Sequence, residues 1–405
     1  MTRRWLELTG VAAAFAGITL LLTLAPAPLA GQGQDSARTP WGEPDLQGLW
    51  TTNSETPLER PARYADKEFF TEEERAELDR LRTGFLTQDT RPHSRGSEQD
   101  VSGAYNPAVF LTHKRTGRRT SLIVDPPDGR IPPLAAEAQQ RRDAFRAYQL
   151  AQLQATDICK NNLPGCQGGT YGPPSPRRDE PPPIYPAASF NRSNDPVDRG
   201  LSERCMSARL PDFGSFTGFM LQIVQSPGHV SIFYDTGQGQ GWQRTIPVTD
   251  RPHLPQDVRQ WWGDSRGRWE GETLVVDVTN FSPKTDFRGS RENLHLVERW
   301  TRLDDETIEY VATMEDPTTW TRPWTVALEL SRQSNEANQI YKEPRCHEGN
   351  YGMPALLAGA RAEEKAFAEG RGPDPATLCN AGCGGLTLPR IADIDLEDRG
   401  NGGPQ

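Results

Sequence analysis

Residues 221–234 read LQIVQSPGHVSIFY, and this stretch decides the fold class. Two runs rich in β-branched and aromatic residues flank the tetrapeptide SPGH at residues 226–229, a pattern typical of a β-hairpin. Further runs with alternating or apolar character follow at Thr273–Thr279, Leu294–Leu303, Ile308–Met314 and Trp324–Leu330. Because sequential strands with short connections pair antiparallel, the sequence predicts a mainly β fold, either an antiparallel barrel or a sandwich.

An earlier segment, DLQGLW at residues 45–50, resembles the G-x-W signature that opens a lipocalin-like barrel. The resemblance favours a calycin-like barrel over a sandwich. So short a strand is not stable alone. We therefore expect Trp50 to join the sheet formed by residues 221–343.

Composition excludes several classes of protein. The chain has 405 residues, 35% of them hydrophobic, with 37 Gly, 35 Pro and a formal net charge of −10. The Gly and Pro content predicts long loops and a few peripheral helices around the core. The acidic balance argues against nucleic acid and against an anionic membrane surface as partners. Beyond the N-terminal segment, the sequence has no apolar run of membrane-spanning length, which excludes a polytopic membrane protein.

The N-terminus resembles an export signal. Arg3 and Arg4 precede the apolar stretch Val11–Leu24, and small residues then lead to a cleavage site near Ala30. Residues 1–30 are therefore predicted to be a signal peptide, with general export favoured over the twin-arginine route. An uncleaved anchor is the alternative. The predicted location is periplasmic or secreted.

The rest of the chain divides into three predicted regions. Residues 40–200 hold a strand, a helix from Thr71 with Glu74 completing a capping box, a helix over residues 134–155, and a Pro-rich loop, all packing on the core. Residues 201–370 form the β-rich core domain and end in a short helix from about residue 354. Residues 371–405 are predicted to be largely disordered.

An even number of cysteines fits an oxidising compartment: Cys159, Cys166, Cys205, Cys346, Cys379 and Cys383. Sequence proximity favours the pairs Cys159–Cys166 and Cys379–Cys383, which leaves Cys205–Cys346 as a long-range bridge. The alternative is metal binding by the knuckle at residues 379–383. A structural zinc site needs four ligands, and the sequence offers no second close Cys/His pair.

Longer blocks resemble a group of uncharacterised exported proteins of environmental bacteria. The blocks are SLIVDPPDGRIPPL at residues 121–134, RPHLP at 251–255, GDSRGRWEG at 263–271 and CHEGNY at 346–351. The resemblance covers residues 40–364 and implies export, with no established activity. At residues 214–219 the sequence reads GSFTGF, where relatives carry a Tyr-Asn-Asn type stretch.

Tryptophan is concentrated in the β-rich region: Trp242, Trp261, Trp262, Trp269, Trp300, Trp320 and Trp324. Most of these rings are expected either to fill the barrel or to provide stacking surfaces for a ligand. Trp261 and Trp262 are adjacent, and neighbours on a strand point to opposite faces. One of them is therefore predicted to line a groove, an interface or the surface beneath a loop.

Acid–base chemistry has candidates among four histidines, namely His229, His253, His295 and His347. The acidic candidates are Asp264, Glu298, Asp316 and Glu348. His253, Asp264, His347 and Glu348 are the predicted catalytic groups, and the alternative is that the histidines hydrogen-bond loop backbones. Their spacing matches no H-E-x-x-H or H-x-H metal motif, so no metal is expected. The sequence also shows no G-x-S-x-G elbow, phosphate loop or dinucleotide fingerprint, and no cofactor is expected.

The loop Arg251–Gly271 and the segment Cys346–Tyr351 are predicted to converge at the mouth of a pocket. Both are rich in polar, aromatic and turn-forming residues. The predicted ligand-binding residues are Trp261, Trp262, Arg266, Arg268 and Asn350, although Arg266 and Arg268 are also suited to structural pairing with Asp264 or Glu348. Three functions stay open. They are binding of a small aromatic, saccharide or lipid-like ligand, an enzyme at the barrel mouth, and a structural component of the envelope.

Overall fold

The computed structural model describes most of the chain: residues 37–52, 54–87, 115–185, 191–201, 203–206, 210–213, 220–237, 240–333 and 346–379. The predicted signal peptide, the loop at 214–219 and the chain beyond residue 379 lie outside the described residues. Residues Arg38–Gln405 make up one compact unit, to which everything below refers. Among the described residues, the structure contains no helix with both the length and the apolar character needed to span a membrane.

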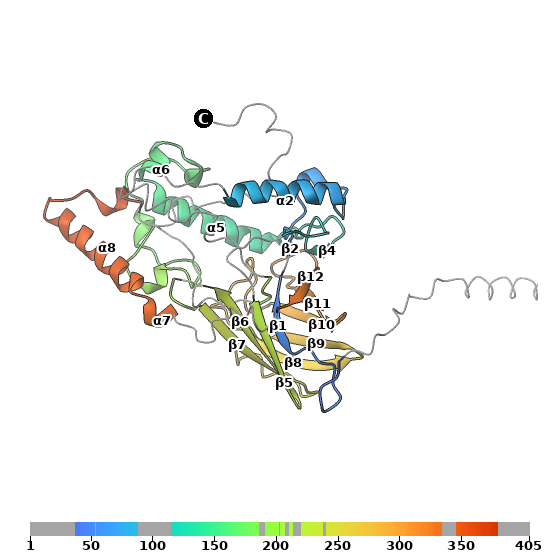
Figure 1. The fold of residues 1–405 in the computed structure, drawn as a ribbon. Coiled ribbons are helices and arrows are strands. Elements are labelled where there is room, and N and C mark those ends of the chain that lie inside the picture. Colours follow the sequence, from blue (N-terminus) through green and yellow to red (C-terminus); the bar gives the residue numbers. More distant parts are fainter. Residues whose placement is uncertain are drawn as a thin grey trace, which may run out of the picture. The chain divides into compact units, whose positions relative to one another are not determined.

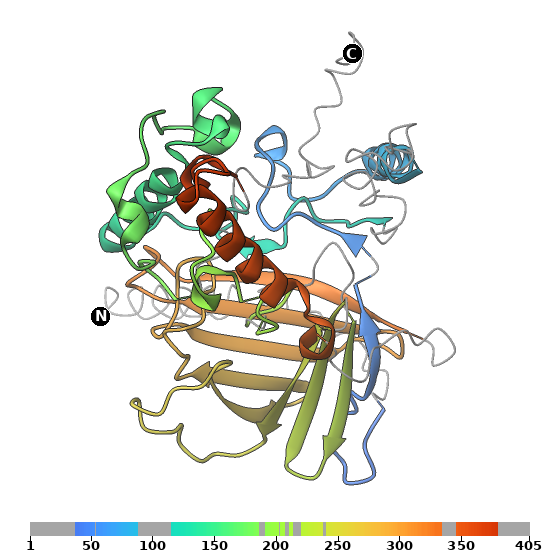
Figure 2. The same ribbon diagram turned by 90° about the vertical axis from the view of Figure 1, so that its left-hand side faces the viewer.

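The centre of the fold is a nine-stranded antiparallel barrel. Its strands follow the spatial order β7-β6-β5-β1-β12-β11-β10-β9-β8. In chain order they are β1 (Gly48–Thr51), β5 (Met220–Ser226), β6 (His229–Gly237), β7 (Gln240–Pro247), β8 (Asp264–Glu270), β9 (Thr273–Thr279), β10 (His295–Arg302), β11 (Thr307–Glu315) and β12 (Trp324–Arg332). In Figure 2, β5–β7 (green) cross in front of β8–β12 (yellow to orange), so the two groups form opposite walls.

The barrel closes at a seam between β7 and β8. Along the order from β7 to β8, all neighbouring strands are antiparallel to each other. Because the order holds nine strands, its first and last strands, β7 and β8, run in the same direction. A parallel bridge joins Val248 to Gly267, and the Thr249 amide donates to the Gly267 carbonyl at 2.9 Å. This near closure covers the two edges that an open sheet would leave exposed.

The prediction for Trp50 is confirmed. β1 pairs with β5, where Trp50 lies opposite Leu221, and with β12, where it lies opposite Arg332. Figure 1 shows this early strand (blue) next to β5 (green), which comes much later in the sequence. The Trp50 indole is fully buried and donates to the Leu46 carbonyl at 3.0 Å.

The predicted strands at 221–234, 273–279, 294–303, 308–314 and 324–330 are confirmed, but two strands of the barrel were not predicted. One is β7. The other is β8, which occupies the second half of the stretch Arg251–Gly271 that the sequence analysis treated as a loop. Of its inward positions Ser265, Gly267 and Trp269, only the last is large and apolar. A Cβ added at Gly267 would lie 3.0 Å from a methyl of Ile246.

Shorter strands and helices precede the barrel in the chain. β4 (Ile123–Asp125) pairs with the beginning of β12, and β2 (Ser54–Glu55) pairs with β3 (Arg115–Thr116) in a separate small sheet. α2 (Glu72–Thr87) begins with the predicted capping box, because the Thr71 amide donates to Glu74 at 2.8 Å and the Glu74 amide donates to the Thr71 hydroxyl at 3.3 Å. α5 (Ala136–Leu153) confirms the second predicted helix.

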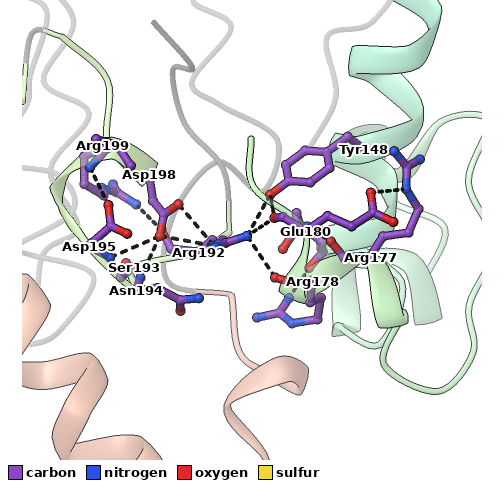
Figure 3. A network of polar contacts seen from close by, with 12 residues as sticks. Tyr148, Arg177, Arg178, Glu180, Arg192, Ser193, Asn194, Asp195, Asp198 and Arg199 are labelled. Atoms are coloured by element: carbon purple, nitrogen blue, oxygen red, sulfur yellow. Dashed lines mark hydrogen bonds and ion pairs between the residues drawn. The ribbon is translucent and has the colours of Figure 1, made fainter. Parts of the chain in front are cut away.

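The Pro-rich segment that follows α5 folds back onto this helix. It contains α6 (Asp157–Lys160) and three 3₁₀ turns, η2 (Pro164–Cys166), η3 (Pro176–Asp179) and η4 (Pro196–Asp198). Arg192 connects the Pro-rich segment to α5. Its guanidinium donates to the Tyr148 hydroxyl of α5 at 3.0 Å and pairs with buried Asp198 at 3.1 Å (Figure 3). Asp198 also accepts backbone amide bonds. These contacts join the Pro-rich segment to α5 and fit a scaffold.

The C-terminal part contains α7 (Cys346–Gly349), α8 (Gly352–Ala368) and the 3₁₀ turn η5 (Pro375–Thr377). Two predicted disulfides are confirmed, Cys159–Cys166 and Cys205–Cys346. Cys379 is also disulfide-bonded, while Cys383 lies outside the described residues. Disulfides of this kind fit an oxidising, extracellular environment.

Alternation along the strands directs apolar side chains into the barrel. The largest fully buried ones include Trp50, Trp300, Trp320, Trp324 and Tyr234. Burying one large apolar side chain stabilises the fold by about 1.5–3 kcal/mol, so this interior accounts for much of the driving force for folding. Most of the tryptophans therefore belong to the core, which is the first of the two alternatives predicted for these rings.

Candidate functional site

Two charged residues occupy inward positions of the barrel. Arg244 lies on β7 between inward Trp242 and Ile246, and Glu298 lies on β10 between inward Leu296 and Trp300. Their side chains are 3% and 0% exposed and form an ion pair. A buried charge pair costs desolvation energy that its own attraction barely offsets, so this pair is not explained by stability alone.

Tyrosines complete the buried cluster. The Tyr310 hydroxyl donates to Glu298 at 2.9 Å, and the rings of Tyr310 and Trp300 are 4.3 Å apart. Burial raises the pKa of Tyr310, and the Glu298 charge raises it further. Burial likewise raises the pKa of Tyr234, against the opposing effect of the Arg244 charge. Both phenols therefore keep their protons.

The pKa of Arg244 is also raised. Burial by itself disfavours the guanidinium charge, but the Glu298 carboxylate, together with the Tyr234 and Tyr310 phenols, more than offsets this effect. Arg244 is thus a fixed cation inside the barrel, with Glu298 as its counter-charge.

Several hydrogen-bond donors of this cluster lack partners. Among the described residues, nothing accepts from Arg244 Nε and Nη1, Tyr234 Oη, Trp242 Nε1 or Trp300 Nε1, although all are buried. Each such buried donor costs about 1–3 kcal/mol, and native proteins leave few of them. Other buried atoms without a partner, such as Trp320 Nε1 and Trp324 Nε1, lie elsewhere in the described chain. The five donors of this cluster make it suited to an acceptor.

An aromatic stack leads from this cluster towards the loop before β8. Tyr234 and Trp242 are stacked 4.1 Å apart at an interplanar angle of 4°, and Trp242 stacks on Trp262 at 4.7 Å. Trp262 and Trp261 lie in a turn, not on a strand as the sequence argument assumed. Trp262 packs on the core, whereas Trp261 lies 6.4 Å from the Tyr185 ring. That one of them lines a groove, an interface or the surface beneath a loop stays a prediction.

Asn280 anchors the loop that carries these tryptophans. Its side-chain amide is directed at the carbonyls of Leu254, Pro255 and Val258, at 2.8–3.1 Å. Asn280 is buried and adopts φ 59°, a conformation that Asn tolerates better than most residues. The loop is therefore fixed against the barrel.

The predicted catalytic pair His253 and Asp264 meets on the outer face of the barrel. His253 Nδ1 lies 2.9 Å from Asp264 Oδ2, and His253 Nε2 lies 2.9 Å from Asp277 Oδ1. Asp277 Oδ2 in turn contacts His295 Nε2 at 3.1 Å, and the other nitrogen of His295 is 3.5 Å from Glu315. His295 is one of the candidates predicted from the sequence, whereas Asp277 is not.

Charges in this outer network shift one another. The hydrogen bond from His295 lowers the pKa of Asp277, with a further contribution from His253. The hydrogen bond to Asp277 raises the pKa of His295, opposed by partial burial. Both ring nitrogens of His253 already face carboxylates, which suits a residue that ties the loop to the strands. Its catalytic role stays a prediction.

The two predicted binding arginines have partners on the surface. Arg266 pairs with Asp264 at 2.6 Å, and Arg268 pairs with Glu270 at 2.7 Å. The structural alternative considered for Arg266 and Asp264 is thus the observed pairing. Asp316, another acidic candidate, organises a turn by accepting from the Ser290 hydroxyl at 2.6 Å and the Thr319 hydroxyl at 2.7 Å. His229 is exposed beside a hairpin turn.

Segment Cys346–Tyr351 approaches the loop through intermediaries. Asn350 donates to the Glu203 carbonyl at 2.8 Å, next to the Cys205–Cys346 bridge. Arg204 lies between Glu203 and Cys205 in the sequence and donates to the Tyr185 hydroxyl at 3.2 Å. The Tyr185 ring in turn faces Trp261. His347 is exposed, and the Glu348 side chain lies outside the described residues. Direct convergence of the two segments stays a prediction.

Sequence reasoning missed Arg244, Tyr234 and Tyr310. A usable signal was present: Arg244 and Glu298 occupy positions that share a face with apolar neighbours two residues away on each side. A charge on the inward face of a barrel strand indicates a buried site. No group of His, Cys, Asp and Glu in the described ranges could hold a metal ion.

Comparison with family models gave no match, and comparison with curated proteins gave none either. Among solved structures, a point mutant of the fluorescent protein UnaG is similar at 18% identity, over 37% of this chain and 92% of that one, with a TM-score of 0.21. The strand pairing itself defines the class of this protein, a mainly β protein built on a nearly closed antiparallel barrel.

Proposed function

We propose that the barrel binds a small, largely apolar molecule whose hydrogen-bond acceptors meet the buried donors around Arg244. The observation that carries this proposal is the surplus of unpartnered donors on Arg244, Tyr234, Trp242 and Trp300. A ligand that accepts from them would remove the cost of leaving them unsatisfied. The surrounding Leu, Ile, Val and Met side chains suit an apolar body.

A fluorescent probe tests the proposal without knowledge of the natural ligand. Titration of the protein with neutral N-phenyl-1-naphthylamine is expected to give saturable fluorescence. Small ketones and esters are expected to displace the probe. In Tyr234→Phe, which removes one donor, their affinity should fall by about 3- to 10-fold, as expected for the loss of one neutral hydrogen bond.

Tyr351→Phe is the matched control, because it removes the same hydroxyl from a side chain that is 79% exposed. It should leave the affinities unchanged. Absence of saturable probe binding would contradict the proposal, and so would equal affinities in wild type and Tyr234→Phe.

We also infer that the protein is exported by its N-terminal segment and belongs with the exported proteins that share its sequence blocks. The disulfides of the described residues support export. N-terminal sequencing of the protein from the periplasm or medium of expressing cells tests it. A mature chain that begins near residue 31 is expected, and protein found in the cytoplasm with reduced cysteines would contradict it.

A further inference from the structure

We propose that the acceptor group of the ligand is uncharged, a ketone, ester, lactone or amide, and that Glu298 is the residue that excludes a carboxylate. This inference rests on the proposed function and deepens it. It concerns which of two ligand chemistries the donors around Arg244 select. An unpaired buried arginine would favour a carboxylate, whereas an arginine that already has a counter-charge does not.

Charge balance inside the barrel supports the uncharged ligand. Arg244 and Glu298 are both buried and neutralise each other. The inward groups nearest to them, the phenols of Tyr234 and Tyr310, keep their protons because burial raises the pKa of each. A carboxylate placed here would leave one net negative charge in an apolar interior, and burying an uncompensated charge is strongly unfavourable.

The donors themselves remain available to a neutral oxygen, since Arg244 Nε and Nη1 and Tyr234 Oη have no partner among the described residues.

The two requirements together define the ligand class. The donors demand an acceptor, and the charge balance demands that it be neutral. A carbonyl oxygen meets both demands, because it has two lone pairs and adds no charge. The apolar lining of the barrel then selects for the body of the molecule.

Matched pairs of probes test the choice directly. Methyl decanoate and decanoate form a linear pair, and methyl 2-naphthoate and 2-naphthoate form a planar pair. Each compound displaces N-phenyl-1-naphthylamine at pH 8, where both acids are ionised. In the wild type, the better-binding pair is expected to favour its ester by about tenfold or more, which corresponds to about 1.4 kcal/mol.

Replacement of Glu298 should reverse this preference. Glu298→Gln keeps the shape of the side chain but removes the counter-charge of Arg244, so the acid should gain about tenfold or more relative to its ester. The double variant Arg244→Gln/Glu298→Gln is the control: it removes both charges and should keep the preference for the ester. If Glu298→Gln does not fold, the wild-type ratio and the double variant still decide.

The outcomes separate the two proposals. A wild type that prefers the acid would overturn the inference, and so would a Glu298→Gln protein with an unchanged ratio. Probe binding that small ketones displace, without competition by any of the four compounds, would overturn the inference and leave the proposed function standing. Failure of the probe to bind the barrel at all would overturn both.

Discussion

Strand β10 carries two polar residues that belong to very different surroundings. Glu298 points into the barrel, while His295, three residues earlier, points to the outer face. Inside, the Arg244–Glu298 pair lies among donors that have no partner in the described part of the chain. Outside, His253 and His295 present each ring nitrogen to a carboxylate, with Asp277 shared between them.

The difference separates structure from function. A polar network whose groups satisfy one another has little left to offer a ligand and serves to hold chain segments together. The outer network does this for the loop that carries Trp262. A buried cluster with surplus donors lowers the stability of the fold, and such a cost is expected where a protein binds a ligand.

The largest effect is expected from Glu298→Ala. This change leaves Arg244 as a buried, unpaired cation, and breaking a buried pair in this way destabilises a protein by about 3–5 kcal/mol. Urea unfolding measures the loss. No single substitution in the outer network is expected to lower the free energy of unfolding by as much as Glu298→Ala does.

A double variant makes that prediction sharper. Arg244→Met combined with Glu298→Leu removes both charges and replaces them with apolar side chains of similar length. Because the desolvation cost disappears with the charges, the double variant should be about as stable as wild type, or more so. A loss as large as that of Glu298→Ala would show that packing, not charge, sets the cost.

The second largest effect is expected on the outside, from Asn280→Ala. Three loop carbonyls lose their donor, and Ala is strained at the positive φ of this residue, so we expect a loss of about 2 kcal/mol in the free energy of unfolding. Asn280→Gly removes the same bonds without the strain and should lose less. Equal losses would show that strain contributes nothing.

A smaller effect is expected from Asp277→Asn. It weakens the contacts to His253 and His295 but leaves the Asn280 anchor in place, so the loss should be about 1 kcal/mol because the carboxylate is partly exposed. Tryptophan fluorescence of the folded protein should hardly change. A loss as large as that of Asn280→Ala would mean that the histidines, not Asn280, hold the loop.

Much of the barrel could be predicted from sequence, because β9 to β12 alternate apolar and polar residues and follow one another closely. β8 could not. Its outward positions Asp264, Arg266 and Arg268 are charged. Its inward residue Gly267 is small, and Ile246 lies against it, so the sequence of β8 shows no apolar stripe.

The candidate site was harder to predict than the fold. The interior pair joins positions 54 residues apart, and only closure of the barrel brings Arg244 to Glu298. By contrast, His253 and Asp264 are only 11 residues apart in the sequence, and their contact could be anticipated. What local spacing does not reveal is that Asp277 would occupy the second nitrogen of His253.

The smallest effect concerns pH and the outer network alone. His295 has a raised pKa in the folded protein, so its pairing with Asp277 contributes stability that is fully present below the unfolded value of about 6.5 and is lost as pH rises through the folded pKa. Asp277 has a lowered pKa, so its contribution is present above about pH 4 and is lost as pH falls through its folded pKa. Both side chains are about a third exposed, at 39% and 30%, and screening therefore limits the effect to less than about 1 kcal/mol.

NMR titration of the His295 ring should show a pKa above the ordinary histidine value that returns towards it in Asp277→Asn. Urea unfolding of the wild type should show a small loss of stability between pH 6 and 9 that shrinks in the same variant. If the two proteins lose equal stability over this range, the network contributes nothing to the pH dependence, and the contrast with the interior pair rests on the buried charges alone.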